Sequence, residues 1–104
     1  MNTRELYQEI VELAGLELKG KNMLYTSANG HMYSQLNKDG EIGIRMSKAD
    51  QKEMSENYGA TEFRSYGAKM RDYIRVPEDQ LADKKLLADW LKKGHEFVLS
   101  LEPK

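Results

Sequence analysis

The sequence predicts an α+β domain, a two-layer α/β sandwich in which a five-stranded, mostly antiparallel sheet carries helices on one face. Two turn signals, Asn29-Gly30 and Lys38-Asp39-Gly40, separate three short runs of apolar and β-favouring residues between positions 23 and 46. An Asn-Gly pair suits the type I′ turn of a β-hairpin. A second hairpin is predicted around Gly67, and a broad apolar stripe at helical spacing follows it. The predicted order is therefore helix, three strands, helix, two strands, helix.

The first predicted helix covers residues 3–14, where apolar side chains recur at intervals of three and four. Thr3 is the expected N-cap, because its hydroxyl can accept a hydrogen bond from the first helical turn. Three strands follow, and the third alternates most cleanly. Its inward set is predicted to be Ile42, Ile44 and Met46.

The second predicted helix begins after Ser47, which resembles the start of a capping box, and it ends at Gly59. Its apolar side is thin, so we expect it at the rim of the domain. Two strands over 63–66 and 70–76 form the second hairpin. Pro77 ends the last strand, because proline has no N–H to donate to a sheet.

The final helix is predicted from Asp83, a good N-cap, to about Ser100. Its apolar stripe is the widest in the chain, so we expect it to cover the buried face of the sheet. Gly94 lies within the stripe and should let another element approach closely. The stripe consists of Leu86, Leu87, Trp90, Leu91, Phe97, Val98 and Leu101.

Composition narrows the classes of function. The 104 residues are expected to form one domain, 1–104. A net charge of −1 gives no general reason to expect nucleic acid or an acidic membrane surface. The absence of Cys excludes disulfides and thiolate chemistry. No signal peptide and no apolar run of about 20 residues is found, so we expect a cytoplasmic protein without a membrane partner.

Catalytic patterns are missing from the sequence. It contains no G-x-S-x-G, P-loop or H-E-x-x-H motif. Only His31 and His95 supply imidazole, and both are expected to be structural or solvated, since a metal site needs three or four converging ligands. We therefore expect a non-catalytic protein with no metal and no cofactor.

Three segments carry a resemblance to a known family. They are HMYSQLNKDGEIGIRMSKAD (31–50), FRSYGAKMRDYIRVPED (63–79) and DWLKKGHEFV (89–98). In their order of strands, turns and helices they resemble the TfoX N-terminal-like family, over roughly residues 20–101. The resemblance implies the same architecture as the one predicted above. It further implies a regulatory or interaction domain, in a small stand-alone form, with no catalytic residues.

The strand alternation also predicts a candidate interaction face. If the apolar strand residues face the helices, the opposite face of the sheet presents arginine and tyrosine, the residues enriched in binding hot spots and suited to phosphate contact and base stacking. Two alternatives remain open: the face is an ordinary solvated surface, or a bulge near Asp72 sends Tyr73 inward. The predicted face comprises Arg45, Arg71, Tyr73 and Arg75, with Tyr33 and Gln35 beside them.

Three functional hypotheses follow. The first is a non-catalytic regulatory or protein-interaction domain that binds a partner protein, or a second copy of itself, through the sheet face or a sheet edge. The second is a nucleic-acid-binding accessory protein that uses Arg45, Arg71 and Arg75, and the net charge counts against it. The third is a small-ligand binder or enzyme with a cleft beneath the last helix.

Overall fold

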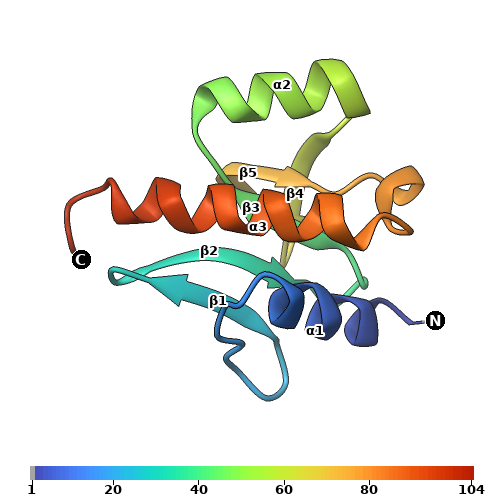
Figure 1. The fold of residues 1–104 in the computed structure, drawn as a ribbon, viewed down its shortest axis with the longest axis horizontal. Coiled ribbons are helices and arrows are strands. Elements are labelled where there is room, and N and C mark those ends of the chain that lie inside the picture. Colours follow the sequence, from blue (N-terminus) through green and yellow to red (C-terminus); the bar gives the residue numbers. More distant parts are fainter. Residues whose placement is uncertain (1) are drawn as a thin grey trace.

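The structure is a computed structural model that describes residues 2–104, and it confirms the predicted α+β class. Three helices accompany a five-stranded sheet whose strands run in the order β1-β2-β3-β5-β4, with every neighbouring pair antiparallel (Figure 1). The elements are α1 (Thr3–Leu13), β1 (Tyr25–Ala28), β2 (His31–Leu36), β3 (Ile42–Arg45), α2 (Lys48–Tyr58), β4 (Thr61–Ser65), β5 (Ala68–Arg75), a 3-10 turn η1 (Glu78–Gln80) and α3 (Lys84–Leu99).

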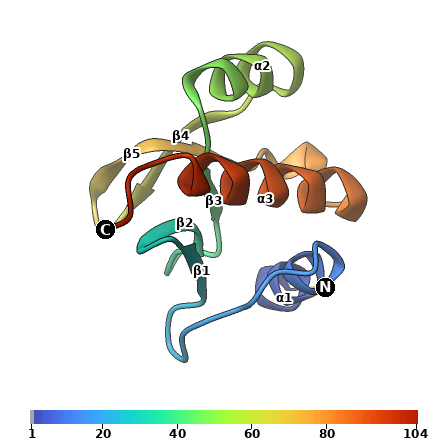
Figure 2. The ribbon, with the colours of Figure 1, turned by 60° about the vertical axis from the view of Figure 1, so that its left-hand side comes forward.

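The helices divide into a packed pair and a separate third. Helices α1 and α3 lie next to each other in front of the sheet, and both views place α2 on the side of α3 opposite to α1 (Figures 1 and 2). Helix α2 buries only Met54, as its thin apolar side predicts. Its Tyr58 ring meets the Trp90 ring of α3 edge-on, with centroids 5.2 Å apart. Helix α2 is therefore held at the rim, as expected.

One continuous core lies between the α1–α3 pair and the sheet. The strand residues Ile42, Ile44 and Met46 belong to it, as the alternation predicts. Gly94 of α3 also behaves as expected, because a Cβ there would lie 2.6 Å from the backbone oxygen of Arg45. Only glycine lets the helix come this close to β3. The fully buried large side chains of the core include Tyr7, Ile10, Val11, Leu87, Trp90 and Leu91.

Hydroxyl groups join α1 to the sheet inside this core. The Tyr7 hydroxyl lies 2.5 Å from Ser34 Oγ, which lies 2.5 Å from Thr26 Oγ1. All three residues are buried, and the shared hydrogen bonds satisfy their polar atoms. Burial raises the pKa of the Tyr7 phenol, since the phenolate would have to leave water.

Side chains and glycines fix the helix ends. Ser47 Oγ accepts from the Asp50 N–H, Gly59 ends α2 with a φ of 74°, and Asp83 caps α3, so these three predictions are confirmed. The prediction that Thr3 caps α1 is wrong. Asn2 is the cap, and its Oδ1 accepts from the Glu5 N–H at 2.8 Å; asparagine is the stronger of the two N-cap residues.

The second face of the sheet is partly covered by the sheet itself. The β4–β5 hairpin curls over it, so that Phe63 lies against Gly43, where a Cβ would come within 2.3 Å of the Phe63 ring. Ser65 Oγ donates to Gln35 Oε1 at 2.8 Å, which ties β4 back to β2. Phe63, Gln35 and Ser65 are all buried. The expectation of a face open to water is therefore wrong in this region.

Both hairpins contain a bulge. In the β1–β2 pair the register shifts between Thr26↔Ser34 and Ser27↔Met32, which leaves Tyr33 as an extra residue on β2. In the β4–β5 pair it shifts between Glu62↔Ile74 and Arg64↔Lys69, so residues 70–73 oppose a single residue of β4. A bulge re-aims the side chains beside it.

Candidate functional site

The predicted interaction face is not a single exposed surface. Tyr33 is 1% exposed and Tyr73 is 7% exposed, so the prediction that they form an exposed surface is wrong. The reasons differ: the β2 bulge turns Tyr33 toward α3, whereas Tyr73 stays on the opposite face of the sheet and is covered there by Phe63. The alternative in which a bulge near Asp72 turns Tyr73 inward is not the one the structure has, because Ile74 pairs with Ile44 in the core while Tyr73 pairs with Arg45 on the opposite face. Asp72 adopts a left-handed φ of 67°.

Contacts hold both tyrosines in place. The Tyr73 ring stacks on Phe63, with centroids 5.9 Å apart, and its hydroxyl donates to the Met32 oxygen at 2.9 Å. The Tyr33 ring meets His95 of α3 edge-on at 5.4 Å. Burial raises the pKa of both phenols. Neither ring is available for stacking against a nucleic-acid base.

The three arginines of the predicted face lie in three different settings. Arg45 is half-buried and its guanidinium lies 5.5 Å from the centre of the Phe97 ring, in a cation–π contact. Arg75 pairs with Glu41 at 3.1 Å. Arg71 is exposed and lines a groove beside α2. The structure therefore brings only Arg71 and Tyr73 of the five predicted residues into one hollow.

That hollow, here called the α2–hairpin groove, lies between α2 and the β4–β5 hairpin. Its volume is about 700 Å³, within the size range of ligand-binding clefts. The β5 bulge contributes three of its lining residues. The groove is lined by Lys48, Gln51, Lys52, Ser55, Ala60, Thr61, Glu62, Lys69, Arg71, Asp72, Tyr73 and Ile74.

The Asp72 carboxylate is held in place by two side chains of α2. Its carboxylate lies 2.8 Å from Lys48 Nζ and 3.5 Å from Gln51 Nε2. The hydrogen bond from Lys48 is the largest cause that holds the pKa of Asp72 below its usual value, and Gln51 and the charge of Arg45 add to it against the cost of desolvation. Gln51 Nε2 also donates to the Met46 oxygen at 2.8 Å, which anchors α2 to the end of β3.

The groove carries an excess of positive charge in a chain whose net charge is −1. Four cationic residues line it against two carboxylates, Glu62 and Asp72. Within residues 2–104, no salt bridge involves Lys69 or Arg71, and both are exposed. Their charges are therefore free to meet an anionic partner.

The groove also contains two aliphatic hydroxyl side chains. Ser55 and Thr61 supply hydroxyl groups, but no histidine lines the groove to activate them as nucleophiles. Across the part of the chain that the structure describes, no group of three or more His, Asp or Glu side chains is placed to hold a metal ion.

The two histidines lie outside the groove. His31 Nε2 lies 2.8 Å from the Glu102 backbone oxygen, next to the β1–β2 turn. His95 packs against Tyr33.

Sequence reasoning missed three of the four cations in the groove. Lys48 and Lys52 are four residues apart on α2, a spacing that places them on one face of the helix. Lys69 directly precedes the β5 bulge and Arg71 lies within it, so strand alternation does not relate the two. No local sequence pattern predicts that α2 lies beside the β4–β5 hairpin. The sequence alone therefore does not show that these cations line one groove.

Comparisons with protein-family models, with curated proteins and with solved structures find no match to this chain. The resemblance to the TfoX N-terminal-like family therefore stays a prediction that rests on the quoted segments. No helix among the described residues has both the length and the apolar character required to cross a bilayer.

Proposed function

We propose that this chain is a non-catalytic regulatory or protein-interaction domain, of the type found in the TfoX N-terminal-like family, and that it binds an acidic segment of a partner protein in the α2–hairpin groove. The observation that carries the proposal is a pair of exposed cations, Lys69 and Arg71, in a groove of about 700 Å³. Neither forms a salt bridge with a carboxylate among residues 2–104.

The other groups of the groove support a peptide as the occupant. Gln51, Ser55 and Thr61 are donors and acceptors of the kind that meet a polypeptide backbone. Glu62 and Asp72 would repel a continuous row of phosphates but can accept from the N–H groups of a peptide. Complementary charge in such a groove contributes mainly to the rate and specificity of association.

Nucleic-acid binding is the alternative, because the same cations suit phosphate groups. The burial of Tyr33 and Tyr73 removes the stacking surface on which that hypothesis relied. Because Arg45 and Arg75 are engaged by Phe97 and Glu41, the cations available for a phosphate backbone are fewer than the sequence indicates.

The test measures the binding of two labelled probes, an acidic peptide of about ten glutamates and a thymidine oligonucleotide of about ten bases, by fluorescence anisotropy at several salt concentrations. We expect the peptide to bind more tightly, and the double variant Lys69→Gln/Arg71→Gln to weaken it roughly tenfold, since each of the two charge-assisted contacts contributes about 0.7 kcal/mol at an exposed site. The matched control is Lys85→Gln/Lys92→Gln, which removes two exposed lysines of α3.

Tighter binding of the oligonucleotide, with a steep loss of affinity as salt rises, would favour the alternative. If both double variants weakened peptide binding equally, the α2–hairpin groove would not be the binding site. Capture from a lysate with the wild-type chain and with the Lys69/Arg71 variant, with and without nuclease, then identifies the partner. Sedimentation of the protein alone shows whether that partner is a second copy.

A further inference from the structure

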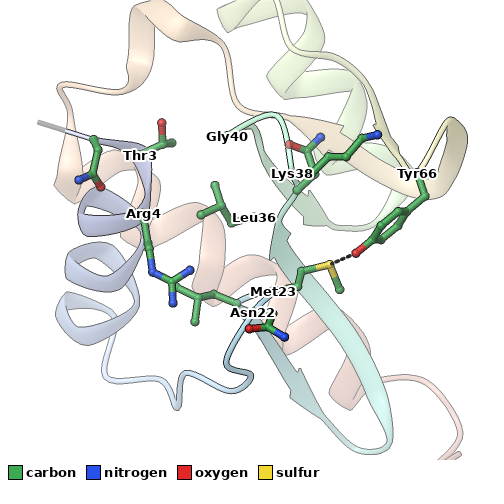
Figure 3. A pocket seen from close by; sticks show the side chains of 11 residues that line it. Thr3, Arg4, Asn22, Met23, Leu36, Lys38, Gly40 and Tyr66 are labelled. Atoms are coloured by element: carbon green, nitrogen blue, oxygen red, sulfur yellow. Dashed lines mark hydrogen bonds between the residues drawn. The ribbon is translucent and has the colours of Figure 1, made fainter.

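A second hollow lies on a different part of the molecule and shares no residue with the α2–hairpin groove. It has a volume of about 470 Å³. Four segments distant in the sequence surround it: the start of α1, the chain just before β1, the β2–β3 turn and the tip of the β4–β5 hairpin (Figure 3). The lining residues of this hollow, called the α1–tip pocket, are Asn2, Thr3, Arg4, Asn22, Met23, Leu24, Leu36, Asn37, Lys38, Gly40 and Tyr66.

The pocket has an apolar base and one aromatic wall. Leu24 and Leu36 are part of the protein core and end at its base. Figure 3 shows Leu36 in the middle of the pocket, with Arg4 on the α1 side and Tyr66 on the opposite side. Tyr66 is 71% exposed although it is a large aromatic residue. An apolar base beside an exposed ring is the setting in which a planar ligand stacks.

The position of Tyr66 is costly for the fold. Its φ is 54°, in the left-handed region that glycine or asparagine adopts far more readily than a bulky residue. The Tyr66 hydroxyl donates to Met23 Sδ at 3.7 Å, which aims the ring across the pocket (Figure 3). Residues held in such conformations concentrate at ligand-binding sites.

The charges of the pocket are all positive. Arg4 and Lys38 line it, and no carboxylate does. Among residues 2–104, neither of the two takes part in a salt bridge. One Arg4 N–H group donates to the Lys21 backbone oxygen at 3.0 Å, and this bond positions the guanidinium near the chain before β1 (Figure 3). A guanidinium has five N–H donors, so others remain to bind an anion.

We propose that the α1–tip pocket binds a small aromatic anion, with its ring against Tyr66 above Leu36 and its anionic group held by Arg4. Lys38 lies on the Tyr66 side of the pocket and adds positive charge there (Figure 3). The apolar base, the exposed ring and the two cations each account for one part of such a ligand. This site is independent of the groove in which the partner segment binds.

The first experiment compares two probes of the same shape, naphthalene-2-carboxylate and naphthalene-2-carboxamide, by isothermal titration calorimetry and by NMR chemical-shift mapping on the full chain. We expect the carboxylate to bind at least tenfold more tightly, with the largest shifts at Leu36 and Tyr66. Equal affinities of the two probes, or shifts centred on other residues, would overturn the proposal.

The second experiment uses variants of the exposed rim. Arg4→Gln should weaken carboxylate binding about fivefold, as expected for a direct contact at a partly solvated site, and Lys38→Gln should weaken it about twofold, since Lys38 acts only through its charge. Lys92→Gln is the matched control and should leave binding unchanged, because Lys92 is exposed on α3. A loss of affinity in all three variants would reduce the site to a general charge effect and contradict the proposal.

The role of the ring is tested with Tyr66→Asn, which keeps a residue that tolerates the left-handed turn. This variant should fold at least as stably as wild type, as checked by thermal unfolding, and should lose about tenfold in affinity for naphthalene-2-carboxylate. Unchanged affinity in a folded Tyr66→Asn chain would show that the ring is not part of the site.

Discussion

The two β-hairpins of this domain use the same kind of turn for opposite purposes. Both turns place two consecutive residues in the left-handed region, Asn29-Gly30 in the β1–β2 hairpin and Tyr66-Gly67 in the β4–β5 hairpin. The first turn is built from the residues that favour this conformation and is tied to α3. The second turn holds an exposed tyrosine, Tyr66, in the same left-handed conformation. The β1–β2 hairpin is therefore a structural element, while the β4–β5 hairpin contributes residues to both candidate binding sites.

The bulges extend this contrast. In the β1–β2 hairpin a single extra residue, Tyr33, turns into the core beside α3. In the β4–β5 hairpin four residues oppose one, and Asp72 in their midst faces Lys48 of α2. A small bulge thus adjusts packing, whereas a large one opens a groove.

The largest expected effect comes from breaking the curl of the β4–β5 hairpin. Phe63→Ala should lower the free energy of unfolding by about 3–5 kcal/mol, because the ring is completely buried against Gly43 and Tyr73. Chemical denaturation followed by circular dichroism measures the change. Leu99→Ala, at an apolar side chain that is 53% exposed, is the control and should lose less than about 1 kcal/mol. Similar losses in the two variants would mean that Phe63 is not buried beneath the curl.

A medium effect is expected in the other hairpin. Asn29 Nδ2 donates to the backbone oxygens of Val98 and Leu101, at 2.9 Å each. Asn29→Asp keeps tolerance for the left-handed turn but removes both donors, and it should cost about 1–2 kcal/mol, measured by thermal unfolding. Asn29→Gly serves as the companion variant, since it relieves the turn while losing the same bonds. A loss confined to Asn29→Asp would indicate charge repulsion rather than lost hydrogen bonds.

The smallest effect concerns Asp72 and depends on pH. Its pKa is lower in the folded chain than in the unfolded chain, chiefly through Lys48, so its ionised form stabilises the fold above the unfolded pKa, ordinarily near 3.9. That contribution is lost as the pH falls through the folded pKa. Asp72→Asn should therefore be less stable than wild type near pH 7, by less than about 1 kcal/mol for a pair with one exposed partner, and the two should converge in acid. A stability difference that stays constant from pH 7 to acid would contradict this assignment.

Local rules predicted the elements of this fold and missed the site. Ser47, Gly59 and Asp83 mark helix ends through interactions within a few residues, so the sequence alone identifies them. Strand alternation is equally local, but it does not predict where a bulge leaves a residue unpaired or which side chain of another strand covers the sheet. Tyr33 was therefore assigned to the wrong face, and Tyr73 was assigned to a surface that Phe63 in fact covers.

The groove and the pocket required tertiary information as well. Lys48 and Lys69 belong to elements that meet only after folding, and the same holds for Arg4 and Tyr66. Of the predicted face, Arg71 alone is an exposed residue of the α2–hairpin groove. A period-two pattern can place a cation on a strand, but only the packing of a helix beside that strand makes it part of a site.

The bonds from Asn29 to the end of α3 also set an order of events during synthesis. The donor and its two acceptors are separated by 69 and 72 positions in the chain, and the Lys104 N–H returns to the Asn29 oxygen at 3.2 Å. A nascent chain can therefore form the β1–β2 turn long before Val98 and Leu101, whose carbonyl groups accept hydrogen bonds from the Asn29 side-chain amide, have been synthesised. The carbonyl groups at the end of α3 are bonded to Asn29 only after residues 98–104 have left the ribosome, so the β1–β2 turn and the end of α3 are completed together.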